Sequence, residues 1–216
     1  YATRRGAREA VSTILAMGVP PDLPNRAGEY PLDLAFSSGD TAVLNTLSEA
    51  APLQRCDERG NNALQRTFLN YSADNMLRIS RAKYDHLSRG RESGSSRVFN
   101  FQNDDGDTIL HLLSQREVPG IAGNYLIMLL LLGTDRNVQN SSGETALHAS
   151  IDAGDPDLTV ELLSSDEELR EQLRRSADIQ YLVAGRAIDP IALDPNVQDV
   201  QGRTILMALL ASRMAH

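Results

Sequence analysis

The stretch Asn103-Asp-Asp-Gly106-Asp-Thr-Ile-Leu-His111 returns 37 residues later as Asn140-Ser-Ser-Gly143-Glu-Thr-Ala-Leu-His148. Both copies begin with an Asn three residues before a Gly, a spacing typical of a tight turn in which the Gly adopts a positive φ angle. A Thr follows two residues after the Gly, where a helix can begin, and apolar residues come directly after it. The repeated stretch therefore predicts a tight turn that leads into a helix.

Three further copies of the pattern occur in the chain. They are Asn25-Arg-Ala-Gly28-Glu-Tyr-Pro-Leu-Asp33, Asp57-Glu-Arg-Gly60-Asn-Asn-Ala-Leu-Gln65 and Asp199-Val-Gln-Gly202-Arg-Thr-Ile-Leu-Met207. The copy at Asp57 is the weakest match, because Asn62 and Gln65 replace the Thr and the His. A second motif, Gly133-Thr-Asp-Arg-Asn137, begins ten residues before Gly143, and segments at Gly18 and Ala192 keep the same distance from Gly28 and Gly202.

The two motifs together resemble those of the ankyrin repeat, in which a Thr-Pro-Leu-His helix start follows a β-turn at a period near 33 residues. The resemblance covers nearly the whole chain. It implies an all-α fold with almost no sheet, an ankyrin-repeat solenoid of stacked helix-turn-helix units joined by β-turn loops. The implied units of this single domain, residues 1–216, are 7–24 (partial), 25–56, 57–102, 103–139, 140–198 and 199–216 (partial).

Spacing between the glycines predicts two insertions. Gly60 and Gly106 are 46 residues apart, and Gly143 and Gly202 are 59 apart, against a period near 33. We place the first insertion at residues 86–97, which are polar, and the second between 164 and 190. Ser165-Asp-Glu-Glu168 forms a capping box, so the second insertion is predicted to contain a helix over about 165–185. In the partial first unit, a helix over residues 7–18 should turn Val11, Ile14 and Leu15 inward.

Composition limits the class of protein and its location. Hydrophobic residues make up 41% of the chain and aromatic residues 5%, which predicts an ordinary globular core built from aliphatic side chains. The single cysteine, Cys56, excludes an intramolecular disulfide, so we expect an intracellular protein of the cytoplasm or nucleus, or of the host cytoplasm if it is a secreted effector. No apolar run is long enough to span a bilayer, and we expect no membrane partner. The chain starts with Tyr instead of Met, so we expect it to be a piece of a longer protein.

Charge is distributed unevenly along the chain, whose net charge is −8. Residues 55–97 carry nine Lys/Arg against five Asp/Glu, whereas residues 98–216 carry eight against eighteen. An acidic chain of this kind favours a protein partner over nucleic acid. The basic stretch lacks the interleaved aromatic residues of a nucleic-acid site, so it either faces an acidic protein or is simply solvated. Its basic side chains are Arg78, Arg81, Lys83, Arg89, Arg91 and Arg97.

No pattern of catalytic or metal-ligating residues stands out. His111 and His148 could serve as bases or ligands, but no acidic or thiol cluster accompanies them at ligand spacing. In the ankyrin family the Thr and His of this motif bond to each other and to the turn, so the resemblance implies a structural role for both. We therefore expect no cofactor, no metal and no enzyme activity in this segment. Leu131 and Leu132 either pack against the second insertion or form an exposed interface.

The resemblance implies a module that binds another protein through its turn tips and the concave face of its inner helices. Alternatives are a substrate-recruiting ankyrin domain of a larger enzyme, such as a secreted bacterial effector, and a scaffold or inhibitor of a regulatory protein. We expect a monomer whose partner presents basic residues to the fourth unit. The predicted binding residues are Arg26, Ala27, Glu29, Ser37, Ser38, Glu58, Arg59, Asn61, Asp104, Asp105, Asp107, Gln115, Arg116, Ser141, Ser142, Glu144, Asp152, Ala153, Val200, Gln201 and Arg203.

Overall fold

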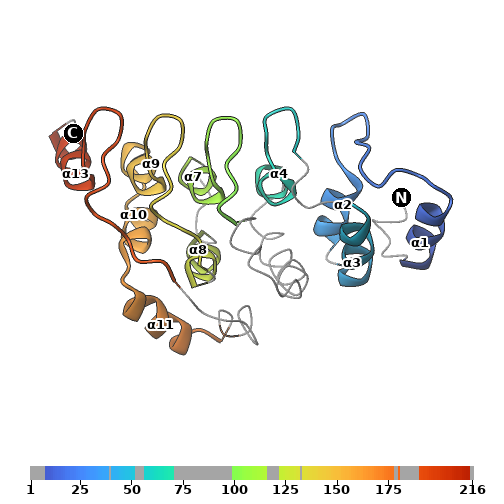
Figure 1. The fold of residues 1–216 in the computed structure, drawn as a ribbon. Helices are drawn as coiled ribbons and strands as arrows, with labels where there is room; N and C mark the ends of the chain where they lie inside the picture. The colour runs from blue at the N-terminus through green and yellow to red at the C-terminus, as the bar shows by residue number, and fades with distance from the viewer. Residues whose placement is uncertain are drawn as a thin grey trace. The chain divides into compact units, whose positions relative to one another are not determined.

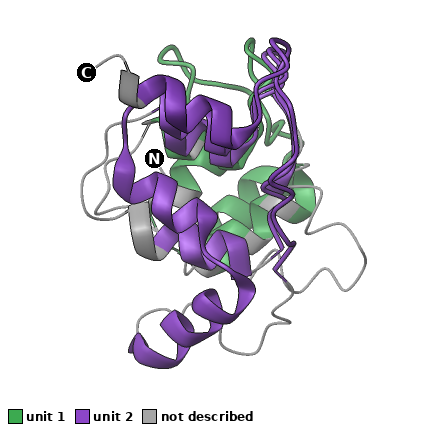
Figure 2. Ribbon diagram, turned by 90° about the vertical axis from the view of Figure 1, so that its left-hand side faces the viewer, with its two compact units in different colours: residues 1–98 green, residues 99–216 purple. Residues whose placement is uncertain are grey.

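The computed structural model describes residues 8–38, 40–51, 56–70, 99–115, 122–131, 133–177, 180 and 190–214. The chain divides into two compact units, residues 1–98 and 99–216, and each is described by itself (Figures 1 and 2). Within the described ranges the regular elements are α-helices, and the only β pairing is an isolated antiparallel bridge between Gln198 and Thr204. The all-α class predicted from the sequence is confirmed.

Four described helices form unit 1: α1 (Arg8–Ala16), α2 (Pro31–Ser38), α3 (Thr41–Ala50) and α4 (Ala63–Asn70). Helix α2 packs against α3 and α4, and α1 packs against α3. Their shared core is aliphatic, as the composition predicted, and consists of Val11, Leu32, Ala35, Val43, Leu44, Leu47 and Ala63.

One prediction for α1 is wrong. Val11 is buried and Leu15 packs against the core, but Ile14 is 41% exposed. Among the described helices α1 contacts α3. A single neighbouring helix such as α3 covers only a narrow stripe along α1. Residues four apart, such as Val11 and Leu15, lie closest to the line of that stripe, whereas Ile14 falls on its edge.

Six described helices form unit 2: α7 (Ile109–Ser114), α8 (Ala122–Leu131), α9 (Ala146–Asp152), α10 (Pro156–Leu163), α11 (Asp166–Arg175) and α13 (Ile205–Met214). Helices α7, α9 and α13 lie in one row, with α9 in contact with both others, while α8 and α10 form a second row (Figure 1). Helix α10 packs against α8 and α9. The apolar residues 125–131 of α8 are all buried.

The second insertion contains the predicted helix. The hydroxyl of Ser165 accepts from the N–H of Glu168, and the Glu168 carboxylate accepts from the N–H of Ser165 at 2.7 Å, so the capping box begins α11 as expected. Leu169 is fully buried, and α11 contacts α8. Leu131 at the end of α8 is also fully buried, so the alternative that it forms an exposed interface is wrong. The helix ends at Arg175, ten residues before the predicted bound.

Arg136 joins the insertion to the rest of unit 2. Its buried guanidinium donates to the carbonyl oxygens of Leu162 at 3.1 Å and Ser164 at 2.6 Å, where α10 ends. It also donates to the carbonyl oxygen of Ile191 at 2.9 Å and lies 3.4 Å from the Asp166 carboxylate. One side chain therefore fixes both ends of the inserted segment.

Several sequence predictions fall outside the described residues. They concern the first insertion at 86–97, Leu132, Arg116 and the basic cluster of Arg78, Arg81, Lys83, Arg89, Arg91 and Arg97. Across the described ranges, none of the helices combines the length and apolar character needed to cross a membrane.

Candidate binding surface on the turns

All five predicted turns adopt one hydrogen-bonded geometry. In the turn at Asn140, the side-chain oxygen accepts from the N–H groups of Ser142 and Glu144, both at 3.0 Å. The N–H of Gly143 donates to the main-chain oxygen of Asn140 at 2.9 Å. The same three bonds recur at the other turns, and the five glycines have φ angles between 68° and 76°. The first residues of the turns are Asn25, Asp57, Asn103, Asn140 and Asp199.

The two residues between the first Asn or Asp and the Gly form the tip of each turn. The side chains of these tip residues take no part in the shared bonds, and both residues are exposed in every turn. Their identity changes from turn to turn while the backbone beneath them stays the same. The tip pairs are Arg26 and Ala27, Glu58 and Arg59, Asp104 and Asp105, Ser141 and Ser142, and Val200 and Gln201.

In unit 2 the turns are bonded to one another. The N–H of Ser141 donates to the main-chain oxygen of Asp105 at 2.9 Å, and the Asn140 side chain donates to the Asp107 carboxylate at 2.9 Å. Neighbouring tips therefore keep a fixed spacing.

A row of glutamines adds a second connection between these turns. The amide of Gln102 donates to the carbonyl oxygen of Gly106 in its own turn and to that of Gln139 in the next, both at 2.8 Å. Gln139 repeats this with Gly143 and with Gln198. The sequence analysis did not predict this row, although a Gln directly precedes each of the three turns of unit 2.

Substituting two glycines should separate backbone strain from the packing of the turns. Gly106 and Gly202 have φ angles of 75° and 74°, but a Cβ at Gly106 would lie 2.6 Å from the nitrogen of Ser141, whereas a Cβ at Gly202 would meet nothing within 4 Å. We expect Gly106→Ala to be less stable than Gly202→Ala by about 1–3 kcal/mol, because the bond from Ser141 to Asp105 must break. Urea unfolding followed by circular dichroism measures this difference. Equal midpoints for the two variants would contradict the close approach of the turns.

Both histidines of the repeated motif are structural. The N–H of Thr108 donates to Nδ1 of His111 at 3.1 Å, which places the ring proton on Nε2, and Nε2 donates to the carbonyl oxygen of Glu144 at 2.9 Å. His148 makes the same bonds to Thr145 and, through Nε2 at 3.1 Å, to the carbonyl oxygen of Arg203. Both rings are buried. Each ring thus fixes its own helix start and bonds the following turn, which confirms the structural interpretation.

Other residues take over the same position in unit 1. The N–H of Asn62 donates to Oε1 of Gln65 at 3.0 Å, and the N–H of Gln65 donates to Oδ1 of Asn62 at 2.9 Å. The weakest match in the sequence therefore keeps the same reciprocal cap. In the preceding copy, the Asp33 carboxylate accepts from the N–H of Tyr30 at 3.2 Å.

The cap of α7 should make stability depend on pH. Burial lowers the pKa of His111 below its usual value of about 6.5, although the Glu144 carbonyl and the Asp107 carboxylate act in the opposite direction. The unfolded chain then binds the proton more tightly, so this contribution to stability is complete above about pH 6.5 and is lost as the pH falls.

The double variant Thr108→Asn and His111→Gln, which copies Asn62 and Gln65, should remove this dependence. We expect it to lose less stability than the wild type between about pH 7.5 and pH 5, as measured by urea unfolding. A parallel loss in both proteins would show that His111 does not titrate as inferred.

The structure changes the set of predicted binding residues. Asn61 and Asp107 are buried, so the expectation that they face a partner is wrong. Each directly follows the Gly of its turn and donates its N–H to the side chain of the first residue of that turn. The side chains are hydrogen-bonded too. Asn61 donates to Asp57, and Asp107 accepts from Asn140 and Gln115.

The other predicted residues differ in how accessible they are. Ser38, Gln115, Asp152 and Ala153 are exposed, whereas Glu29, Glu144 and Arg203 are half-buried. Arg203 binds the carboxylates of Asp199 at 2.6 Å and Asp152 at 3.2 Å. The side chain of Ser37 and all of Arg116 lie outside the described part of the chain.

The described residues contain no group of three or more His, Cys, Asp or Glu side chains able to hold a metal ion. No family model matches the chain, and no curated protein sequence matches it significantly. The exposed tips of the turns are the candidate binding surface that the geometry above describes.

Proposed function

We propose that this chain is a degenerate ankyrin-type repeat protein that binds a partner protein through the tips of its turns. The observation that carries the proposal is the combination of a constant turn backbone with exposed tip residues that differ from turn to turn. A fixed backbone lowers the entropy cost of binding, because the side chains are already placed when the partner arrives. Variable side chains on such a frame can supply specificity without disturbing the fold.

Charge at the tips indicates what the partner of unit 2 presents. Asp104 and Asp105 are exposed and adjacent, while Ser141, Ser142 and Gln201 are neutral. A partner that spans these tips should place Lys or Arg opposite the first pair only. Exposed charges of this kind increase the rate of association and fix the register more than they increase affinity.

The test is to reverse the tip charge and compare a matched control. Asp104→Lys with Asp105→Lys changes two exposed carboxylates, and Glu167→Lys with Glu171→Lys makes the same change of charge on α11, outside the turns. Proteins captured from lysate by the wild type are identified by mass spectrometry, and their association rates are then measured with each purified variant.

We expect the tip variant to slow association about tenfold or more at low salt, with a smaller effect at high salt, while the control associates normally. Circular dichroism checks that both variants fold. The proposal fails if the control loses binding and the tip variant keeps it, because the partner would then be held by the inserted helix.

A further inference from the structure

Two glutamines of unit 2 present oriented hydrogen-bond acceptors to solvent. Gln102 and Gln139, called the glutamine row from here on, are both exposed. The amide nitrogen Nε2 of each donates to two main-chain oxygens, one within its own turn and one directly before the next turn. Both hydrogens of each amide group are therefore used inside the protein, and the oxygen Oε1 is left over.

The direction of each amide is fixed by its partners. A main-chain oxygen can only accept, so the atom of Gln102 that lies 2.8 Å from the oxygens of Gly106 and Gln139 must be the nitrogen. Oε1 lies on the other side of the same planar group and points away from these carbonyls. No donor among the described residues is bonded to Oε1 of Gln102 or Gln139. The row therefore holds two exposed acceptors in fixed directions.

The repeat of the turns sets the spacing of the row. The turns of unit 2 stand side by side, and they overlap in the view along the row (Figures 1 and 2). Helices α7 and α9, which follow the first two turns, pack against each other. Gln102 and Gln139 hold the same place before these turns, so their Oε1 atoms should be separated by about the 8–10 Å typical of packed helices.

This spacing selects one backbone conformation for a partner segment. In a polyproline II helix, side chains on one face recur every three residues, about 9.3 Å apart. Neighbouring side chains on one face are about 6.6 Å apart in a β-strand and about 5–6 Å apart in an α-helix. Two turns of α-helix measure about 10.8 Å, which is longer than the row. A polyproline II segment therefore places one side chain opposite each Oε1.

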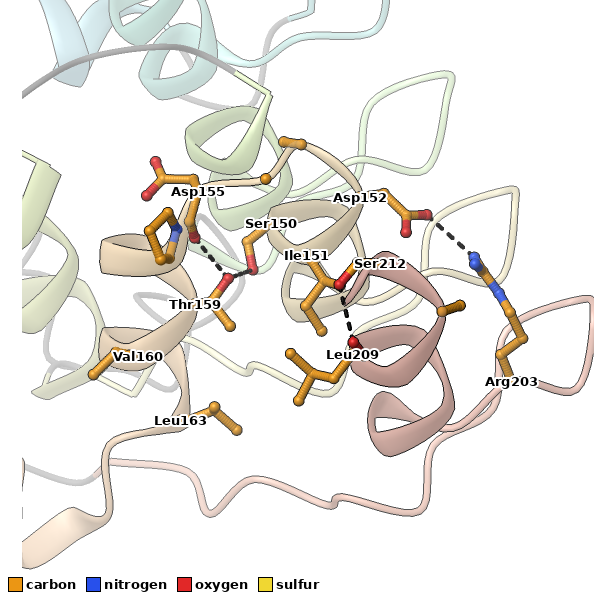
Figure 3. Close-up of a pocket in the computed structure, with 14 residues that line it drawn as sticks. Ser150, Ile151, Asp152, Asp155, Thr159, Val160, Leu163, Arg203, Leu209 and Ser212 are labelled. Carbon is orange, nitrogen blue, oxygen red and sulfur yellow. Dashed lines mark hydrogen bonds and ion pairs between the residues drawn. The ribbon is translucent and has the colours of Figure 1, made fainter. Parts of the chain in front are cut away.

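The surroundings of the row favour a positively charged donor. Asp104 and Asp105, in the turn that follows Gln102, are exposed carboxylates. Arg203 follows the third turn, but its guanidinium is engaged by Asp152 at 3.2 Å (Figure 3) and by Asp199 at 2.6 Å. An arginine of the partner suits the row best, because its planar group carries five N–H donors and can bond an amide oxygen and a carboxylate together.

We propose that the glutamine row binds a polyproline II segment of the partner protein, with arginines three residues apart on Oε1 of Gln102 and Gln139. The inference rests on the proposed function, because it assigns the segment that the turns of unit 2 receive. The expected pattern is Arg-x-x-Arg with proline at the intervening positions. Proline holds such a segment in the bound conformation before it binds, which lowers the entropy cost.

The test uses two peptides of equal composition as probes. A fluorescent peptide of about twelve residues repeats Arg-Pro-Pro, and the matched peptide carries the same arginines consecutively between runs of proline. Binding to the full chain is measured by fluorescence anisotropy at low salt. General attraction to an acidic surface does not favour the spaced peptide, because the clustered arginines have the higher charge density. We expect the spaced peptide to bind at least about fivefold more tightly.

Three protein variants locate the binding. Gln102→Lys with Gln139→Lys keeps a donor for the main-chain oxygens but removes the acceptors, and should weaken binding of the spaced peptide about tenfold or more. Gln102→Met with Gln139→Met removes the acceptors without changing the charge and should abolish the preference for the spaced peptide. Glu167→Gln with Glu171→Gln makes the same change of net charge as the Lys variant on α11, outside the turns, and should keep the preference. Circular dichroism checks that each variant folds.

Four results would overturn the inference: no binding of the spaced peptide, equal binding of both peptides, a preference that survives in the Lys and Met variants, or tighter binding of an α-helical peptide with arginines seven residues apart. The proposed function is judged separately, by the association of the captured partner with the variant Asp104→Lys with Asp105→Lys. A slow association there, together with equal binding of the two peptides, would leave the tips as the binding surface and remove the glutamine row from it.

Discussion

Replacing Arg136 by Met should lower the free energy of unfolding of unit 2 by about 3–5 kcal/mol. The side chain is almost fully buried and donates to the carbonyl oxygens of Leu162, Ser164 and Ile191. Met fills most of the volume but leaves these oxygens without a donor, and each unsatisfied buried acceptor costs about 1–3 kcal/mol. The loss should appear in urea unfolding as a lower midpoint.

Arg175→Met provides the control for this prediction. Arg175 is exposed and pairs with Glu171 on the surface of α11, so its removal should change stability by less than about 1 kcal/mol. Similar midpoints for the Arg136 and Arg175 variants would show that the carbonyl groups find other donors or water.

Replacing Asp33 by Ala should cost unit 1 about 3–5 kcal/mol. Arg66 donates to both oxygens of this carboxylate, at 3.0 and 3.1 Å, and both side chains are buried. The guanidinium also lies 4.3 Å from the centre of the Tyr30 ring, which holds it in place. Without the carboxylate, a buried positive charge remains without this partner, and that penalty exceeds the loss of the bond itself.

A double-variant cycle separates these contributions. Asp33→Leu combined with Arg66→Met removes both charges and should be more stable than Asp33→Ala, because replacing a buried pair by apolar groups is often nearly neutral. Glu49→Ala, at an exposed position of α3, serves as the control and should change stability by less than about 0.5 kcal/mol. If the double variant is no more stable than the single one, the buried charge is not the cause of the loss.

The features predicted correctly from the sequence are those set by neighbouring residues. Each turn is determined within nine residues, by a first Asn or Asp, a Gly three residues later and a cap at the start of the helix. The capping box of Ser165 and Glu168 begins α11 in the same local way. The two errors in the binding surface come from side-chain bonds. The amide of Asn61 bonds to Asp57, and the carboxylate of Asp107 accepts from Gln115 and from Asn140 of the next turn, so both side chains are held against the protein.

The missed features connect residues that are distant in the sequence. Arg136 bonds to residues 26 and 55 positions away, Arg66 to a residue 33 away, and Gln139 to one 59 away. An isolated Arg or Gln gives no signal in the sequence of whether it lies in a core or in solvent.

The ring-to-carbonyl bonds of the two histidines span very different lengths of chain. His111 reaches a carbonyl 33 residues ahead, and His148 reaches the corresponding one 55 residues ahead, with similar geometry. Lengthening the connection between two turns has therefore left their junction intact. The connection between successive helices can therefore differ in length while the bonds between the turns stay the same. In this chain the longer connection contains the segment between Ser164 and Pro190, which the bonds of Arg136 hold at both ends.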